Sequence, residues 1–370
     1  MPAKSIWLRS ETKANEHRTP LTPSDAKKLI DAGFKVTVEE YPDRCFDLKE
    51  YEEAGCTIAR ANSWTEAPVD TYVLGLKELD SSFTNLNHTH IHFAHCFKDQ
   101  DGWKDVISTF TSGGGRLLDL EFLVDENGRR VVAFGPWAGT VGTALGLLQW
   151  SSHYVGEALH NLQPFPSKAH LLSLTASAVQ KARENGAPQP RVFIMGAMGR
   201  CGKASAEVAE AAGAAIIGWD LFSPDEAIRE KVKAGGPYDE VVKGCEVFVN
   251  AILLQGEIRP FLTRETIMTP DRTLRVIADV SCDPNNPKNP IPIYDAITSH
   301  EVPFVRVLEG NCSLDVIAID NLPSMLPREA SEYFSGGLYP HLAALGGDES
   351  DVWKRAEQVF SSVVKKAEEQ

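Results

Sequence analysis

The chain lacks both a long apolar run and an excess of positive charge. Its 370 residues contain 37 Lys and Arg against 51 Asp and Glu, a formal net charge of −14. This acidic balance disfavours nucleic acid and anionic membranes as partners, because both carry negative charge. No stretch stays apolar over the roughly 20 residues that a membrane-spanning helix needs. We therefore expect neither a nucleic-acid-binding protein nor a membrane protein.

Cysteine pairs and targeting signals are also missing. The seven cysteines form no Cys-x-x-Cys pair and lie at Cys45, Cys56, Cys96, Cys201, Cys245, Cys282 and Cys312. An odd, dispersed set in a chain of this length is typical of reduced thiols. The opening MPAKSIWLRSETK has no apolar core, and the closing AEEQ is no peroxisomal address. These features favour a cytoplasmic protein.

Residues 191–220 carry the most informative pattern, in which a strand, a glycine-rich turn, a helix and a second strand follow one another. Gly196, Gly199 and Gly202 would let the backbone turn sharply and approach a pyrophosphate at the helix N-terminus. Asp220 ends the second strand, where a carboxylate binds the ribose of NAD in preference to NADP. The usual middle glycine of this fingerprint is absent, so a purely structural turn is the alternative.

The rest of the chain alternates strand-like and helix-like segments. Strands are predicted at 5–9, 34–40, 71–76, 90–95, 116–122, 246–254, 273–281 and 314–320. A helix is predicted from Thr22-Pro23 to Gly33, with Thr22 as its cap. Such alternation predicts an α/β fold of two Rossmann-like, doubly wound domains with parallel sheets and a cleft between them. Residues 1–132 with 326–370 would form the substrate-binding domain, and 133–325 the NAD-binding domain.

Polar residues follow the predicted strands, where open parallel sheets bind their ligands. They are Arg18, Lys77, Glu78, His95 and Glu121 in the first domain, and Ser281, Cys282, Asp283 and Asp320 in the second. Lys77 and His95 form a candidate acid–base pair, whose pKa values Glu78 and Glu121 would tune. Alternatively, Lys77 and Glu78 are a solvated ion pair at a strand end.

Several other side chains have both a functional and a structural interpretation. His88, His90 and His92 share one face of a strand, which suits a metal site or an edge or cleft strand with hydrogen-bonded histidines. We expect no metal, because no Cys-x-x-Cys or glutamate completes the set. Cys201 opens the helix of the glycine turn, whose dipole should lower the pKa of its thiol. It is either a site of oxidation or a small residue that fits the turn.

A hairpin is predicted around Asn127-Gly128. Arg129 and Arg130 follow this turn on alternate sides, so one of them could reach the ligand side. An arginine there suits a substrate carboxylate, and a solvated hairpin charge is the alternative.

The chain resembles a known family. Residues 10–23, SETKANEHRTPLTP, resemble the E-x-K-x-x-E-x-R-x-x-L-T-P motif of alanine dehydrogenase and transhydrogenase first domains. Longer segments across essentially the whole chain are similar to the fungal, NAD-dependent, lysine-forming saccharopine dehydrogenases. In chain order they are GLKEL, HFAHCFKDQDGW, LLDLEFL, GRRVVAFG, GAMGRCG, DVSCDPNNPKNPIPIY and AIDNLPSMLPREASEYF.

This resemblance implies the last step of the α-aminoadipate route to lysine. NAD would oxidise saccharopine to an imine, which is hydrolysed to lysine and 2-oxoglutarate. Lys77 would take the proton of the secondary amine, His95 would activate water, and Glu78 and Glu121 would tune this pair. The resemblance also implies a monomer with small-molecule substrates only.

The resemblance assigns two sets of contacts. The substrate set is Arg18, Lys77, Lys98, Gln100, Arg130, Phe134, Ser281, Cys282 and Asp283. The cofactor set is Arg129, Gly196, Gly199, Arg200, Gly202, Asp220, Leu253, Val280, Ile319, Asp320, Asn321 and Leu322. The sequence departs from the family at Leu253, where an aromatic residue can stand, and at Asn321, where histidine can stand.

Two other functions are compatible with parts of the sequence. A dehydrogenase of a smaller amino acid, similar to alanine dehydrogenase, would share the motif at residues 10–23. It would not need as many cations as Arg18, Lys98 and Arg130, which suit the three carboxylates of saccharopine. A catalytically idle NAD-binding regulator would be expected to lack Lys77 or His95, and both are present.

Overall fold

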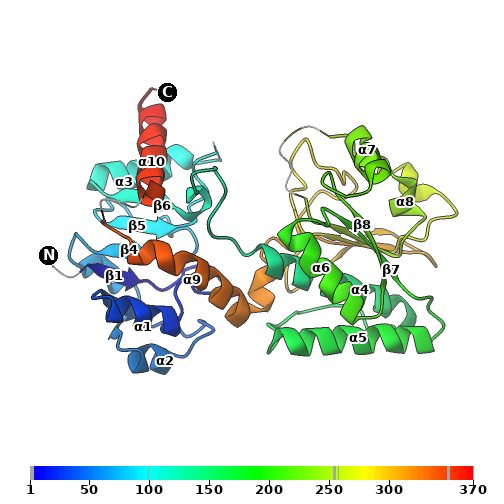
Figure 1. Ribbon diagram of the computed structural model, residues 1–370, viewed down its shortest axis with the longest axis horizontal. Coiled ribbons are helices and arrows are strands. Elements are labelled where there is room, and N and C mark those ends of the chain that lie inside the picture. The colour runs from blue at the N-terminus through cyan, green and yellow to red at the C-terminus, as the bar shows by residue number, and fades with distance from the viewer. Residues whose placement is uncertain (1–3, 99, 253–255, 257, 348–350, 370) are drawn as a thin grey trace. The chain divides into compact units, whose positions relative to one another are not determined.

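The protein consists of two compact α/β units (Figure 1). The computed structural model describes residues 4–98, 100–252, 256, 258–347 and 351–369. Unit 1 comprises Met1–Ala133 and Pro327–Gln370, and unit 2 comprises Phe134–Leu326. Each unit contains one six-stranded sheet that is wholly or mostly parallel, which confirms the predicted pair of Rossmann-like folds. Within the described ranges, none of the helices is both long and apolar enough to cross a membrane.

The sheet of unit 1 has the order β3-β2-β1-β4-β5-β6. Its strands are β1 (Ser5–Leu8), β2 (Lys35–Glu39), β3 (Thr57–Ala59), β4 (Tyr72–Leu74), β5 (Thr89–His92) and β6 (Arg116–Asp119). All five pairings are parallel, so the carboxyl ends of the strands lie at one edge. The strand order reverses between β1 and β4, the position at which doubly wound sheets bind ligands.

Helices cover both faces of this sheet. They are α1 (Pro23–Asp31), α2 (Leu48–Glu53), α3 (Trp103–Gly113), α9 (Pro327–Ala343) and α10 (Asp351–Glu369), with short 3-10 turns η1 (Ser63–Glu66) and η2 (Leu120–Phe122). As predicted, α1 begins at the Thr22 cap, whose side chain accepts a hydrogen bond from the Asp25 N–H. α1 contacts α9, while α3 and α10 pack together beside β6 around Phe110 and Phe360.

The sheet of unit 2 has the order β11-β12-β10-β9-β7-β8. Its strands are β7 (Arg191–Met195), β8 (Ala215–Trp219), β9 (Val247–Asn250), β10 (Val276–Asp279), β11 (Val305–Leu308) and β12 (Leu314–Ile317). Only the edge strand β11 is antiparallel to its neighbour among the pairings of this sheet's described strands. The order reverses between β7 and β9, beside the glycine-rich turn.

Two buried clusters separate the layers of unit 2. One face of the sheet carries α4 (Gly135–Val155), α5 (Lys168–Glu184) and α6 (Arg200–Ala211) (Figure 1). The other face carries α7 (Glu226–Ala234), α8 (Asp239–Val242) and η3 (Thr266–Met268). The short turn η4 (Leu322–Met325) packs on α4. The glycine-rich α4 is buried, as its composition predicts. A Cβ built on Gly139 would lie 2.1 Å from the carbonyl oxygen of Cys201, so glycine allows α4 and α6 to approach closely.

Candidate active site

The carboxyl edge of the unit 1 sheet carries the predicted acid–base pair. Lys77 follows β4 and His95 follows the neighbouring strand β5. Lys77 is half-buried, whereas His95 is exposed. The backbone of His95 has a φ of +51°. This left-handed conformation is strained for a residue with a side chain, and such strain is concentrated at functional sites.

Glu16 lies within electrostatic range of Lys77. Its carboxylate accepts hydrogen bonds from Nε of Arg18 at 2.7 Å and from Nη2 at 2.5 Å. Burial raises the pKa of Glu16, whereas the charges of Arg18 and Lys77 and the hydrogen bonds from Arg18 lower it. The lowering effects together are larger, so the pKa lies below its ordinary value. Sequence reasoning did not assign Glu16 to the site, although its spacing from Arg18 within residues 10–23 was a usable signal.

Glu78 is paired with Lys13, at 2.6 Å between Nζ and Oε1. Among the ion pairs of the described residues, Glu78 is paired with Lys13 and not with Lys77. Burial raises the pKa of Glu78, but the Lys13 hydrogen bond, a backbone N–H and the charge of His95 together hold it below the ordinary value. Glu78 is thus an ionised neighbour of His95, and Lys13 is a second cation that the sequence analysis missed.

Glu121 binds two of the predicted substrate cations. Its Oε1 lies 2.7 Å from Nζ of Lys98 and 2.9 Å from Nη2 of Arg130. Burial raises the pKa of Glu121, but Lys98, Arg130 and His95 lower it below the ordinary value. Gln100 accepts a hydrogen bond from the Lys98 N–H at 2.8 Å. The two cations are therefore held in place by a carboxylate, and this carboxylate also interacts with His95.

Asp119 is a further acidic group near His95. Its side chain is buried at the end of β6 and accepts hydrogen bonds from the backbone N–H groups of Ala94 and Glu121. Burial raises its pKa to about 6, against the lowering effect of these N–H groups. Through these two hydrogen bonds, Asp119 holds the backbone directly before His95 and at Glu121.

Of the two predicted hairpin arginines, Arg129 is exposed and Arg130 is half-buried.

The turn between β7 and α6 in unit 2 has a steric need for glycine. Gly196 has a φ of +87°, and a Cβ there would lie 2.9 Å from the carbonyl oxygen of Ala251. A Cβ on Gly202 would lie only 2.1 Å from the carbonyl oxygen of Gly196. Gly199 caps α6, and Arg200 is the exposed first residue of that helix. The turn therefore brings bare backbone to a helix N-terminus, a setting that binds phosphate groups.

Asp220 contacts this turn directly. Its Oδ2 accepts a hydrogen bond from the Met198 N–H at 2.9 Å, and its Oδ1 accepts one from the Phe222 N–H at 2.9 Å. Each carboxylate oxygen has a second lone pair with which it can accept a further hydrogen bond. The side chain thus braces the turn while keeping acceptor capacity for a hydroxyl.

Residues 281–283 follow β10 around the buried carboxylate of Asp279. The Ser281 and Cys282 N–H groups each donate to Asp279 Oδ1 at 3.2 Å. The side chains of both residues also donate to the main chain, Ser281 to Ile252 and Cys282 to Ala318. Burial raises the pKa of the Cys282 thiol. Ser281 and Asp283 are exposed, whereas Cys282 is half-buried.

The remaining predicted cofactor residues differ in exposure. The side chains of Ile319 and Leu322 are buried in the core of unit 2, so only their main chain can face a ligand. Asp320 is exposed and Asn321 precedes η4. Val280 packs against Gly142, where a Cβ would lie 2.8 Å from Val280 Cγ2. Phe134 is half-buried immediately before α4, and Leu253 lies outside the described residues.

The structure corrects two expectations from the sequence. His90 and His92 lie in β5, which is not an edge strand, and His88 directly precedes it, so the edge position is wrong. Both ring nitrogens of His90 lack a hydrogen-bond partner among the described residues, so these histidines are not all hydrogen-bonded. In the part of the chain that the structure describes, no three His, Cys, Asp or Glu side chains are grouped for a metal.

The second correction concerns Cys201. Its thiol donates to the carbonyl oxygen of Gly135 at 2.9 Å. Burial raises the pKa of this thiol, because the cost of burying the thiolate outweighs the favourable effects of Arg200 and the backbone N–H groups. The expected lowering by the helix dipole is therefore wrong, and the geometry fits the interpretation of Cys201 as a small residue in a tight turn.

Comparison with known proteins places the chain in a family. Residues 7–141 match the family model of the alanine dehydrogenase/PNT N-terminal domain, and residues 174–369 match that of the C-terminal domain. The NAD(+), L-lysine-forming saccharopine dehydrogenase of Emericella nidulans is 44% identical, over 98% of both chains. The chain belongs to the saccharopine dehydrogenase family.

Two further proteins support this placement at different levels. Saccharopine dehydrogenase of Schizosaccharomyces pombe is 43% identical over 99% of this chain and 100% of its own. A solved L-alanine dehydrogenase has a TM-score of 0.70 over 99% of both chains but only 16% sequence identity. The family resemblance predicted from the sequence is thus confirmed, while the likeness to this solved L-alanine dehydrogenase shows the fold alone.

Proposed function

We propose that this chain catalyses the NAD-dependent oxidation of saccharopine to lysine and 2-oxoglutarate, with uptake of water and release of NADH and a proton. The observation that carries the proposal is the 44% identity, over 98% of both chains, to a relative named for this reaction. Lys77 and His95 at neighbouring strand ends of unit 1 supply the acid–base groups that the reaction needs.

The residues of unit 2 fit the dinucleotide. NAD, when bound, accepts the hydride from the substrate carbon. Gly196, Gly199, Gly202 and the first turn of α6 would hold the pyrophosphate, because the lack of room for side chains at Gly196 and Gly202 keeps the backbone of the turn bare. Asp220 would accept a hydrogen bond from a ribose hydroxyl. The other proposed contacts are Arg129, Arg200, Leu253, Val280, Ile319, Asp320, Asn321 and Leu322.

The proton transfers are assigned to unit 1. Lys77, as the free amine, takes the proton from the secondary amine of saccharopine as the carbon–hydrogen bond breaks. His95 accepts a proton from the water that attacks the resulting imine carbon. His95 passes the water proton to the imine nitrogen, which completes the carbinolamine. Lys77 then gives its proton to the same nitrogen as the carbon–nitrogen bond breaks and lysine leaves. His95 takes the proton of the carbinolamine hydroxyl, which yields 2-oxoglutarate and leaves the one proton that the reaction releases. Glu78 and Glu121, whose pKa values lie below the ordinary value, place negative charge near His95.

Saccharopine carries three carboxylates, and the proposal assigns them to the cations of the site. Arg18, Lys98 and Arg130 would bind them, with Gln100, Phe134, Ser281, Cys282 and Asp283 as further contacts. Each of these three cations is ion-paired with Glu16 or Glu121 in the structure. A guanidinium has several N–H donors, so Arg130 can bind a substrate carboxylate while one donor stays on Glu121.

The proposal is tested by adding NADH, lysine and 2-oxoglutarate to the purified protein and following NADH absorbance. We expect NADH oxidation that requires both lysine and 2-oxoglutarate. Turnover with pyruvate and ammonia but none with lysine and 2-oxoglutarate would favour the smaller-amino-acid dehydrogenase. Binding of NADH without turnover of either substrate set would favour the idle regulator.

We further propose that the protein works as a cytoplasmic monomer on small molecules, without nucleic-acid or membrane partners. The net charge of −14 supports the exclusion of polyanionic partners. The monomeric state follows from the resemblance, and sedimentation of the purified protein with and without NADH checks it.

A further inference from the structure

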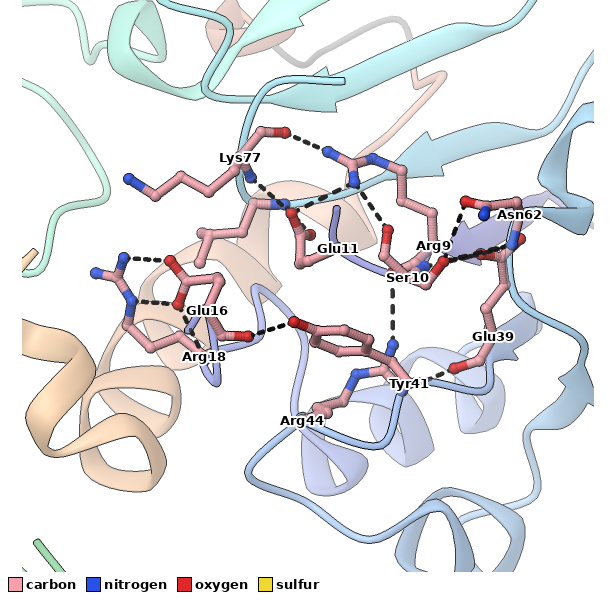
Figure 2. A network of polar contacts seen from close by, with 11 residues as sticks. Arg9, Ser10, Glu11, Glu16, Arg18, Glu39, Tyr41, Arg44, Asn62 and Lys77 are labelled. Atoms are coloured by element: carbon pink, nitrogen blue, oxygen red, sulfur yellow. Dashed lines mark hydrogen bonds and ion pairs between the residues drawn. The ribbon is translucent and has the colours of Figure 1, made fainter. Parts of the chain in front are cut away.

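Two side chains that follow β1 hydrogen-bond with the main chain of Lys77, one with its carbonyl oxygen and one with its N–H (Figure 2). Arg9 Nη2 donates a hydrogen bond to the Lys77 carbonyl oxygen. Glu11 Oε2 accepts one from the Lys77 N–H at 3.0 Å, and Glu11 Oε1 accepts one from the Leu76 N–H at 2.7 Å. Arg9 and Glu11 also contact each other, at 3.3 Å between Nη1 and Oε2. The pair therefore hydrogen-bonds with both peptide groups that flank the Lys77 Cα.

We propose that the Arg9–Glu11 pair is a positioning clamp, which fixes the backbone of Lys77 so that its amine points at the reacting nitrogen. This inference rests on the proposed function, because it assumes that Lys77 exchanges the substrate proton. Arg9 and Glu11 act through Lys77 and are positioning residues.

The clamp lies where the regular sheet ends. The β1–β4 ladder continues as far as the hydrogen bond from the Arg9 N–H to the Leu74 carbonyl oxygen, at 2.9 Å. Beyond it, the segment 75–77 is held on the β5 side by hydrogen bonds from Gly75 N–H to Ile91 and from Phe93 N–H to Leu76. On the β1 side the Arg9 and Glu11 side chains take over from the backbone. The position coincides with the reversal of strand order, where ligands bind.

Because the Arg9–Glu11 ion pair is buried, it contributes little to the stability of the fold. Arg9 is 1% exposed and Glu11 is 8% exposed. Removing two charges from water offsets most of their mutual attraction, so a buried ion pair contributes little net stability compared with apolar side chains. A specific geometric role explains such a pair better than stability does. The pair is itself anchored, since Arg9 Nη1 donates to the Ser10 carbonyl oxygen and Ser10 donates to the buried Glu39 carboxylate (Figure 2).

Gly75 provides a second, independent observation. A Cβ built at this position would lie 2.3 Å from Nε, 2.4 Å from Cζ and 2.5 Å from Nη2 of Arg9, and these are its three nearest atoms. The Arg9 guanidinium thus occupies the space of a side chain at position 75. The backbone of Gly75 is outside the left-handed region. Alanine is therefore compatible with the backbone and conflicts with the arginine, which makes Gly75→Ala a way to displace Arg9 without removing it.

The clamp predicts a split between turnover and cofactor affinity. In Arg9→Met we expect kcat to fall about tenfold to a hundredfold, as for a displacement of about 1 Å at a reacting group. NADH affinity, measured by fluorescence titration, should stay within about twofold of wild type, because the glycine turn is in unit 2. Gly75→Ala should show the same split. The double variant should be no worse than Arg9→Met alone, because the added methyl no longer meets a guanidinium.

Arg44→Met is the matched control. Arg44 is also buried, and its hydrogen bonds go to the main-chain oxygens of Glu39 at 2.8 Å and of Arg9 at 3.4 Å, one step away from Lys77. It should lower the melting temperature to an extent similar to Arg9→Met and leave kcat within about twofold. An equal loss of kcat in Arg44→Met would overturn the clamp, because general loosening of the network would then explain the effect.

A chemical readout separates the clamp from the proposed function. Pyridoxal phosphate with borohydride labels accessible lysine amines, and peptide mass spectrometry gives the rate at Lys77 relative to Lys13. The rate at Lys77 relative to Lys13 should rise at least threefold in Arg9→Met and Gly75→Ala, because the Lys77 backbone loses a hydrogen bond that holds it in place. The relative rate should stay unchanged in Arg44→Met. A wild-type protein inactive on saccharopine would sink the proposed function, while the labelling would still decide the clamp. Unchanged labelling in both Arg9→Met and Gly75→Ala would overturn the clamp, even in a protein that turns over saccharopine normally.

Discussion

The two units have related sheets but very different residues at the point where the strand order reverses. In unit 1, the ends of β1 and β4 lead into charged side chains, including Arg9, Glu11 and Lys77. In unit 2, the ends of β7 and β9 lead into Gly196 and Ala251, which are held too close together for a side chain at Gly196. The same topology thus offers a ligand position twice, and the residues after the strands decide what each position can do.

The largest expected effect comes from removing the charged groups of unit 1. In the double variant Lys77→Met/His95→Gln, turnover should fall by at least about a thousandfold, because both acid–base groups are lost. NADH affinity should stay near wild type. Steady-state kinetics together with fluorescence titration of NADH checks this. Loss of NADH binding with the loss of turnover would mean that unit 1 also holds the cofactor and that the contrast between the units is wrong.

The complementary change is Gly202→Ala in unit 2. Its Cβ would lie 2.1 Å from the Gly196 carbonyl oxygen, so the turn must shift. We expect NADH affinity to weaken at least about tenfold, because backbone groups at the helix N-terminus no longer meet the phosphates. Gly336→Ala in α9 is the control, since a Cβ there meets nothing within 4 Å. Equal NADH affinity in both variants would contradict the role of the turn.

The sequence predicted the glycine turn and the strand-end residues, because both follow from local pattern and one rule about parallel sheets. It did not predict β3 or β11, which lie at sheet edges and whose side chains are exposed or half-buried, so they lack the buried apolar pattern of the inner strands. The clamp on Lys77 was also missed. Its hydrogen bonds join residues 68 and 66 positions apart, and no local pattern encodes such contacts. Burial, which depends on the whole fold, explains the incorrect expectation for Cys201.

The histidines of β5 predict that unit 1 is sensitive to acid. Burial, with the charges of Arg9 and His88, lowers the pKa of His90 to about 3. The unfolded chain binds this proton below its ordinary pKa of about 6.5, whereas the folded chain does not. Stability is therefore complete above that pH and falls by about 2 kcal/mol by pH 5. Thermal melts at pH 7 and pH 5 measure the loss, which His90→Leu should reduce. An unchanged difference in that variant would assign the acid sensitivity to other groups.

The smallest expected effect concerns the carboxylate that holds two substrate cations. Glu121→Gln should lower KM for 2-oxoglutarate by about fivefold, because Lys98 and Arg130 no longer share their charge with a carboxylate, a gain of about 1 kcal/mol. Glu50→Gln is the control, because Glu50 pairs with the half-exposed Arg328. A higher KM in Glu121→Gln would show that Glu121 orients the cations more than it neutralises them.

The most direct test of the central claim is the reaction of saccharopine with NAD on the purified wild-type protein, followed by mass spectrometry of the products. The division of labour between the charged edge of unit 1 and the glycine turn of unit 2 predicts NADH, lysine and 2-oxoglutarate in equal amounts. Saccharopine recovered intact, under conditions where NAD is shown to bind, would contradict it.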